Sequence, residues 1–426
     1  DLTTPGTYTL TYTVTDSDGA EDEVTRTVTV SEAELVSPTG FYNYKFATTE
    51  LRHAFMAAAE KYLMNNMYGG VPLFASGSFA LYSPRLQLPV EDYVAVMGYG
   101  TRFATMGADD STVIMYDGEA GNAGEYTYRT TNSTDPVTFN QWIYDTSTDS
   151  TYMGEYYGAL YDYVFNADKT GYEVVPSMAS GAPIPVDSHI TDTGKEVSKT
   201  WQIPVREGLE WSYFNNGAAP SYVTDNDITA EDFVDTFKIA LDEQWFRAIS
   251  GGGDFIGKSQ AIVGAEEYVD NEDTSDEAWA AVGIKLVDGK IQFTFKDDQS
   301  EWNVKYWLSS FVMTPVHTEM YEELGDTYAT SPSSIAYSGP YVITAYETAV
   351  ILTLEKNPNA ALPDLDFYTH KTFQIIEDTE IAFQTFEAGK LEAIGLPTEK
   401  YDQYKQHPGL RQIPGATTYR IMINAT

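Results

Sequence analysis

The chain has 426 residues, 42% of them hydrophobic and 14% aromatic, which is enough apolar content for two or three folded domains and excludes a disordered chain. Its 63 acidic residues against 25 basic ones give a net charge of −38, which argues against nucleic acid and anionic membrane surfaces as partners. There is no cysteine, which excludes disulfides, thiol nucleophiles and cysteine-ligated metals.

Signals for metals and membranes are weak. The five histidines are scattered, with none within four residues of another, so no local pair exists for zinc. No apolar run reaches the roughly 18 residues of a transmembrane helix. The acidity has two interpretations. Solubility in a salty medium is favoured over a calcium-rich surface, although carboxylate oxygens are the ligands that calcium prefers. We predict no metal site and no cofactor.

Residues 7–30, TYTLTYTVTDSDGAEDEVTRTVTV, predict a β-hairpin. Threonines alternate with apolar residues before a turn at Asp18-Gly19, and valines continue the apolar face after it. A turn is favoured over a calcium loop here, because the glycine comes too early and no glutamate stands at the twelfth position of the loop. The pattern resembles the last strands of a bacterial Ig-like surface domain, over residues 1–31. Because an isolated hairpin is marginal in water, we expect that an N-terminal portion precedes Asp1.

The next segment predicts a linker at residues 31–40 and an amphipathic helix at residues 51–67. Residues 68–86, YGGVPLFASGSFALYSPRL, predict a turn, a buried strand, a loop and a second strand. Residues 107–124 are rich in Gly and Asp and predict a boundary loop.

From Gly124 onward the pattern is mixed α and β. Helix 228–245 has Thr229 as its predicted N-cap, with Asp232 as a capping-box partner. Asp288-Gly289 predicts the turn of a hairpin. The other expected elements are strands within residues 125–139, 194–212 and 339–359, the hairpin at 283–297 and a second helix at 378–394.

The usual catalytic and phosphate-binding motifs are absent. GGGDFIG at residues 251–257 lacks the Lys and Ser/Thr of a phosphate loop and predicts a flexible loop. The acidic run at 270–277 predicts a solvated loop rather than a cation site. The 32 tyrosines and 7 tryptophans suit ligand contact, although most of them are expected in the core. We predict that the chain is not an enzyme.

Several ordered blocks resemble the extracellular solute-binding proteins of ABC importers, and among them the oligopeptide- and dipeptide-binding family 5. The blocks are KTWQIPVREGLEWS, ITAEDFVDTFKIALD, GIKLVDGKIQFTFK, SGPYVITAYETAVILTLEKNPN and IIEDTEIAFQTFEAGKLEAIGLP, in the order of the family, together with the opening block that begins YRTTNSTDPVTFNQW. They cover about 300 residues.

The resemblance implies an α/β, two-lobed fold like that of periplasmic binding proteins (type II, cluster C style), with an N-terminal all-β Ig-like fragment and an incomplete second lobe. The expected domains are residues 1–31, the end of an Ig-like spacer; 32–123, a linker and an extra helix and strand segment on lobe 1; 124–366, lobe 1 with an inserted subdomain; and 367–426, the start of lobe 2.

The resemblance also implies ligand contacts, carried over from the motifs. The segment after the first strand is expected at the cleft, with a helix beginning at Tyr152 beyond it. Trp211 ends the EGLEWS strand, and Tyr341 follows the Gly339-Pro340 turn. The predicted substrate-binding residues are therefore Tyr144, Asp145, Thr146, Ser147, Thr148, Tyr152, Trp211 and Tyr341.

The chain departs from the family pattern in several places. The loop after Trp211 differs, and the segment Asn357–Ala361 lacks the usual aromatic residue. Residues 57–89 precede the family's normal start but are similar to its C-terminal end. We hypothesise that this segment is a duplicated or permuted element whose residues 55–90 contact the lobe at 195–345, and the alternative is an ordinary insertion.

The resemblance implies an extracellular, cell-surface anchored lipoprotein, with an oligopeptide ligand and a membrane ABC permease as partners. The peptide would lie between the two lobes. Other ligands stay open, because some related proteins carry nickel complexes, haem or sugars in place of peptides. The alternative function is a structural or adhesive subunit of the cell surface or of a filament. That alternative is motivated by the acidity and by the N-terminal hairpin, whose edge could pair with a neighbouring copy.

Overall fold

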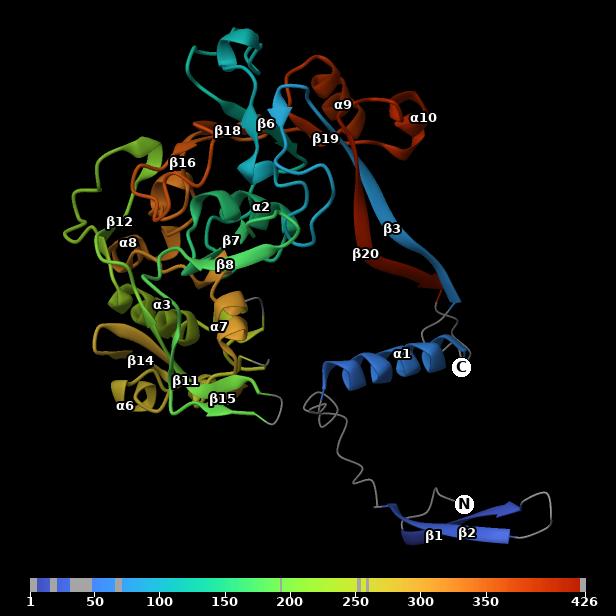
Figure 1. Cartoon of the computed structure of the whole chain (residues 1–426). Coiled ribbons are helices and arrows are strands. Elements are labelled where there is room, and N and C mark those ends of the chain that lie inside the picture. Colours follow the sequence, from blue (N-terminus) through green and yellow to red (C-terminus); the bar gives the residue numbers. More distant parts are fainter. Residues whose placement is uncertain are drawn as a thin grey trace. The chain divides into compact units, whose positions relative to one another are not determined.

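The computed structural model describes residues 6–15, 21–30, 48–65, 71–191, 194–250, 254–257 and 260–421. The chain divides into two compact units, residues 1–69 and 70–426 (Figure 1). In the first unit, β1 (Gly6–Thr15) pairs antiparallel with β2 (Glu21–Val30), which confirms the predicted hairpin. Helix α1 (Thr49–Asn65) confirms the predicted helix. The predicted Asp18-Gly19 turn and the linker at 31–40 lie outside the described residues.

The larger unit contains a four-stranded sheet that includes the SGPY block and the start of the YRTTN block. Its order is β16 (Tyr341–Glu347), β17 (Ile351–Lys356), β18 (His370–Ile375) and β6 (Thr127–Asn132), and the β18–β6 pair is parallel. Helix α2 (Ser147–Tyr156) packs on this sheet, where the Tyr152 ring lies 5.1 Å from that of Phe373. The parallel pair brings the chain's early strand beside a strand more than 200 residues later.

A second sheet is built from strands between residues 184 and 299. It runs β10 (His189–Ile190), β11 (Glu196–Pro204), β15 (Lys290–Gln299) and β14 (Ile284–Val287), and β9 (Ile184–Val186) also pairs with β11. The β14–β15 hairpin is the predicted one, and Asp288 and Gly289 both have positive φ in its turn.

Helix α3 (Ala230–Asp242) packs on the second sheet through Phe233 and Phe237, which are fully buried. Its predicted capping box is present. The Thr229 side chain accepts a hydrogen bond from the backbone of the first helical turn, and the Asp232 side chain accepts one from the backbone N–H of Thr229. The shorter helices of this region are α4 (Phe246–Ile249), α5 (Ala265–Asn271), α6 (Asp276–Trp279), α7 (Glu301–Trp307) and α8 (Thr318–Leu324).

A third sheet contains the segment that precedes the family's blocks. Its central strand β3 (Val71–Tyr82) lies between β19 (Ala393–Gly395) and β20 (Leu410–Ile421), and Figure 1 shows β3 and β20 as a long ribbon. Helix α9 (Thr379–Glu387) packs beside this sheet in a small separate core with Leu81. A short helix, α10 (Tyr401–Tyr404), precedes β20.

This sheet corrects three expectations. Residues 71–82 form one continuous strand rather than two strands with a loop. The strand pairs with residues 393–395 and 410–421 rather than with the lobe at 195–345. The predicted helix at 378–394 ends at Glu387, because Gly389 adopts φ 73° and the chain then turns into β19.

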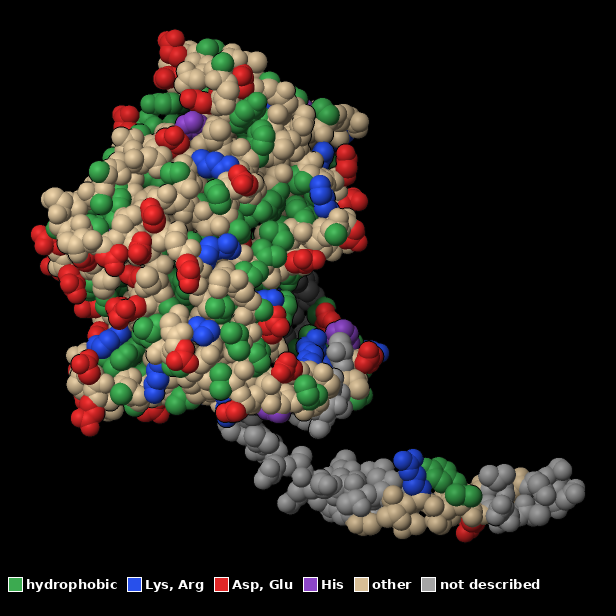
Figure 2. All heavy atoms as spheres, turned by 60° about the vertical axis from the view of Figure 1, so that its left-hand side comes forward, with side chains coloured by type: hydrophobic (Ala, Val, Ile, Leu, Met, Phe, Trp, Pro, Cys, Tyr) green, Lys and Arg blue, Asp and Glu red, His purple; other side chains and the backbone are tan. Residues whose placement is uncertain are grey.

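Short antiparallel pairs complete the larger unit. They are β4 (Leu86–Gln87) with β5 (Thr105–Met106), β7 (Tyr161–Phe165) with β8 (Tyr172–Pro176), and β12 (Leu209–Glu210) with β13 (Asp227–Ile228). Residues 107–124 are mostly irregular, as predicted. Figure 2 shows Asp and Glu side chains spread over the visible face of this unit. Among the described residues, no helix is both long enough and apolar enough to cross a membrane.

Candidate functional site

A pocket of about 130 Å³ lies at the C-terminal end of α2 and is also lined by two loops, one inside a family sequence block and one directly after such a block. The loop at 338–340 belongs to the SGPY block, and the loop at 360–366 follows the NPN block. The lining is mainly polar or small: Arg102, Gly154, Tyr157, Gly158, Ala159, Asp162, Ser177, Ser309, Phe311, Ser338, Gly339, Pro340, Ala360, Ala361, Leu362 and Asp366.

Arg102 carries the pocket's positive charge and is held by two carboxylates. Its Nη1 and Nη2 donate to the two oxygens of Asp162, each at 2.8 Å, and its Nε donates to Asp366 at 3.0 Å. Burial alone would lower the pKa of Arg102, but the hydrogen bonds and charges of the two aspartates raise that pKa above its ordinary value. One guanidinium against two carboxylates leaves a net charge of −1 in this part of the lining.

A buried layer of aromatic residues fixes the position of Arg102. The Tyr368 hydroxyl donates to the carbonyl of Thr101 at 2.5 Å, and the Tyr341 hydroxyl donates to the carbonyl of Tyr368 at 3.1 Å. Lys371 Nζ lies 4.4 Å from the centre of the Tyr341 ring. Because both tyrosine hydroxyls are bonded to the backbone, the peptide that carries Arg102 has little freedom to move.

Two glycines allow the loop at 338–340 to approach α2. A Cβ on Gly339 would lie 2.5 Å from a backbone carbon of Tyr156, and a Cβ on Gly158 would lie 2.9 Å from the carbonyl oxygen of Ser338. The Gly158 N–H donates to the Ser338 hydroxyl at 3.2 Å. The glycine of the SGPY block is therefore required by close backbone packing.

The lining can bind polar groups, and it does not resemble a catalytic arrangement. It contains serine hydroxyls, carboxylates and a guanidinium but no His, Cys or Lys that could serve as a base beside a serine. Within the described ranges, no group of three metal-ligating side chains was found.

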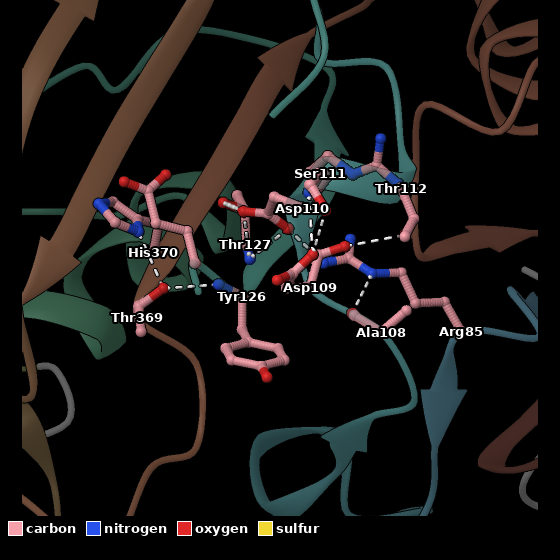
Figure 3. A network of polar contacts seen from close by, with 12 residues as sticks. Arg85, Ala108, Asp109, Asp110, Ser111, Thr112, Tyr126, Thr127, Thr369 and His370 are labelled. Atoms are coloured by element: carbon pink, nitrogen blue, oxygen red, sulfur yellow. Dashed lines mark hydrogen bonds and ion pairs between the residues drawn. The ribbon is translucent and has the colours of Figure 1, made fainter. Parts of the chain in front are cut away.

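A second, largely buried network joins Arg85, in the segment before the family's blocks, to Asp110 and to Thr127 of β6 in the four-stranded sheet (Figure 3). Arg85 pairs with Asp110, which also accepts from the Thr127 N–H at 3.0 Å. Arg85 Nη1 lies 3.1 Å from Glu392, and Arg129 Nη2 lies 2.6 Å from the same carboxylate. Two arginines against two carboxylates give a neutral cluster, which is how charges are tolerated in a core.

The predicted aromatic ligand residues lie in the core. Tyr152 and Tyr341 are fully buried and Trp211 is 2% exposed, so these side chains have almost no surface for a ligand in this conformation. Tyr152 lies in the middle of α2, because the helix begins at Ser147 rather than at Tyr152. Tyr144 is 8% exposed, with its ring 5.6 Å from Phe311 of the pocket and 3.8 Å from the guanidinium of Arg247.

The remaining predicted residues surround the start of α2. Thr146 caps the helix and its hydroxyl donates to Asp149 at 2.7 Å, while Asp145 and Ser147 are exposed and Thr148 is half-buried. These four residues are consecutive in the chain and at least partly exposed, whereas Trp211 and Tyr341 are buried. Tyr341 does not line the pocket, but its backbone neighbour Pro340 does, and its hydroxyl supports the Arg102 segment through Tyr368.

Sequence reasoning missed Arg102, Asp162 and Asp366. In a chain with 63 acidic residues, no single aspartate stands out, and the three positions are separated by 60 and 264 residues along the chain. The scarcity of arginine was the available signal, because an arginine within an acidic fold is expected to have carboxylate partners.

Comparison with known proteins identifies the fold. Residues 173–426 match the bacterial extracellular solute-binding proteins, family 5 (middle part). The chain belongs to this family. Residues 1–30 match the Ig-like domain of bacterial surface proteins, which confirms the resemblance of the N-terminal hairpin.

The chain is similar in sequence to proteins that are named oligopeptide-binding proteins. It is 29% identical to SarA of Streptococcus gordonii over 38% of the chain and 24% of SarA. It is 26% identical to AliA of Streptococcus pneumoniae over 55% of the chain and 36% of AliA. The solved structure of the pheromone receptor PrgZ, which describes its mode of peptide binding, matches with a TM-score of 0.53 and 19% identity over 67% of the chain and 50% of PrgZ.

The family 5 chain thus spans a quarter to a half of the length of these proteins. The match to PrgZ confirms the expected fold class, the α/β fold of two-lobed peptide-binding proteins. Family members are extracellular binding proteins rather than enzymes. That this chain lacks catalytic activity stays a prediction.

Proposed function

We propose that this chain belongs to the extracellular oligopeptide-binding component of an ABC importer. The observation that carries the proposal is the match of residues 173–426 to family 5, together with the similarity to SarA and AliA, which are named oligopeptide-binding proteins. In the proposed mechanism, a peptide binds between two lobes that close by a hinge motion and is then passed to a membrane permease. Anchoring as a lipoprotein belongs to the same proposal.

We place the ligand contacts of this lobe at the exposed start of α2. Asp145 and Ser147 offer a carboxylate and a hydroxyl to solvent, and peptide N–H and C=O groups need such partners in a wet site. The buried Tyr152, Trp211 and Tyr341 support the lobe from inside instead.

A mass-spectrometric capture experiment tests the function. The 426-residue protein is equilibrated with a random hexapeptide library whose C-termini are amidated, then separated from free peptide, and the retained peptides are identified. We expect a retained set with varied side chains, because hydrogen bonds to the backbone carry the affinity. No retention above that of an unrelated acidic protein would refute the proposal.

Matched variants test the placement of the site. Asp145→Asn and Ser147→Ala remove exposed polar groups and should weaken retention. Tyr152→Phe removes only a buried hydroxyl that donates to the carbonyl of Thr134 at 2.8 Å, and it should leave retention unchanged. The reverse ranking would place the ligand elsewhere.

A second candidate function, a surface or adhesive subunit, is favoured by the Ig-like match of residues 1–30. Within the described residues, β1 and β2 pair only with each other, so each has an unpaired outer edge. Light scattering of the protein and of a variant without residues 1–47 tests this. Self-association that disappears with the deletion supports the candidate, and a monomer in both cases refutes it.

A further inference from the structure

A second pocket, of about 320 Å³, lies at the junction of β3, β4 and the start of β20. It is separate from the Arg102 pocket, and the two share no lining residue. Its walls combine apolar side chains such as Leu86 and Val90 with hydrogen-bond donors, among them Ser83 and Arg411. A pocket that is mostly apolar and holds a few converging polar groups is the usual form of a small-molecule site.

Arg411 has no carboxylate partner among the described residues, although the chain is very acidic. The guanidinia of Arg85, Arg102 and Arg129 each pair with at least one acidic side chain. Arg411 Nη1 instead donates to the carbonyls of Pro408 and Leu410, both at 2.9 Å. Among the described residues, no carboxylate lies within ion-pair distance of Arg411.

One edge of the Arg411 guanidinium is therefore unused. Its Nε is buried without a hydrogen-bond partner, and its Nη2 has none among the described residues. The Nε and Nη2 hydrogens point the same way, so both oxygens of one carboxylate can accept them together. An unsatisfied buried donor is costly, and a bound oxyanion would remove that cost.

A second donor in the pocket is also unsatisfied. The hydroxyl of Ser83 is buried without a partner, while its backbone N–H is fixed by the carbonyl of Glu392 at 2.8 Å. His407 lines the same pocket, and its Nδ1 accepts from the Gly409 N–H at 3.1 Å, which leaves Nε2 as the donor of the ring. The only acidic side chain of the lining is Glu91, which is exposed.

Close backbone packing fixes the wall that carries His407 and Arg411. The carbonyl of Gly409 accepts from the Tyr82 N–H at 3.0 Å, and a Cβ on Gly409 would lie 2.0 Å from the Tyr82 carbonyl oxygen. Only glycine allows this approach, so the loop at 407–409 is held against the end of β3. The wall of the pocket at residues 407–409 is therefore fixed by backbone packing against β3.

We propose that this pocket binds a small organic carboxylate with an apolar body, with the carboxylate on Arg411 and Ser83 and the body against Leu86 and Val90. The carboxylate could belong to a free acid or to the C-terminus of a peptide, since the chemistry is the same. The site is distinct from the proposed peptide contacts at the start of α2.

Calorimetric titration of the 426-residue protein with 3-phenylpropionate tests the proposal, with 3-phenylpropanamide as the neutral analogue. We expect saturable one-to-one binding of the acid and none of the amide. Arg411→Gln should weaken binding about tenfold or more, since it removes a charge-assisted bond. Arg420→Gln, which changes an exposed arginine on the same strand, should have no effect.

Two further variants keep the test decisive if Arg411→Gln does not fold. Ser83→Ala should weaken binding, because it deletes an unpartnered hydroxyl, and it should leave the unfolding midpoint unchanged. Glu91→Gln should leave binding unchanged or strengthen it, because it removes a negative charge beside the ligand. Weaker binding in Glu91→Gln would overturn the assignment to an anion.

A tripeptide that ends in phenylalanine, compared with its C-terminal amide, distinguishes the two sources. Arg411-dependent binding of the tripeptide assigns the site to peptide ends, and binding of 3-phenylpropionate alone assigns it to free acids. Absence of saturable binding to either acid, or equal binding of the neutral amides, would overturn the proposal. The hexapeptide capture experiment uses amidated peptides, so its outcome is independent of this one.

Discussion

Replacing Glu392 by glutamine should strongly destabilise the larger unit. Glu392 is fully buried and accepts four hydrogen bonds from two arginines. Arg129 contributes its backbone N–H at 2.8 Å, Nε at 3.0 Å and Nη2 at 2.6 Å, and Arg85 contributes Nη1 at 3.1 Å. Glu392→Gln leaves the shape unchanged but removes one negative charge, so two buried guanidinia then face only Asp110.

The magnitude follows from the broken charge balance. Breaking a buried ion pair from one side costs about 3–5 kcal/mol, because the remaining charge is left without compensation. At about 2–4 °C per kcal/mol for a large domain, a cost of about 3 kcal/mol lowers the melting temperature by about 6–12 °C. Urea unfolding followed by tryptophan fluorescence measures the change, and the slope should be unaltered because the surface exposed on unfolding is the same.

Two comparisons control this prediction. Glu347→Gln changes an exposed glutamate at the end of β16 and should cost less than about 0.5 kcal/mol. Arg85→Met should cost less in the Glu392→Gln background than in the parent, since it restores the balance of charge. A loss below about 1 kcal/mol for Glu392→Gln, or full additivity with Arg85→Met, would refute the argument.

Three further predictions concern other parts of the larger unit. Arg102→Met should lower the free energy of unfolding by about 2–3 kcal/mol, because the nearly buried Asp366 loses its cation; an unchanged urea midpoint would contradict this. Gly339→Ala should cost about 3 kcal/mol or more, since its Cβ would overlap backbone atoms of α2, and a cost no larger than that of Gly389→Ala would show that the loop can move. Burial lowers the pKa of His317 below its ordinary 6.5, so the unfolded chain takes up a proton first as the pH falls. The free energy of unfolding should therefore be constant above about pH 7 and decrease as the pH falls through 6.5. In urea titrations at several pH values, His317→Gln should remove that slope, whereas His189→Gln, at an exposed site, should not.

Local sequence signals predicted the elements that depend on neighbouring residues. The alternation in residues 7–30, the capping box at Thr229 and the Asp288-Gly289 turn each act within a few positions, so the strand, helix and turn appear where they were expected. Errors arose where a distant partner decides the outcome. Residues 71–82 form one strand because β20 pairs along most of their length.

The candidate site shows the same division. The motifs marked the loops at 338–341 and 357–361, and both do border or adjoin the pocket. The motifs could not say that the side chains of Tyr152, Trp211 and Tyr341 point into the core, because burial depends on which sheet faces cover one another. Family resemblance locates backbone segments more reliably than it locates the side chains that a ligand can reach.

The sequence by itself determined the family and the class of fold: an acidic α/β chain of solute-binding family 5 preceded by an Ig-like segment. Composition, local periodicity and ordered motifs can all be recognised without coordinates. Only the tertiary structure decided which of the many charges matter. Arg102 lies between Asp162 and Asp366, Arg85 and Arg129 share Glu392, and Arg411 is left without an acid, although the residues of each group are far apart in the chain. Electrostatic energy depends on distance in space and on burial, and both are set by the fold rather than by the order of residues.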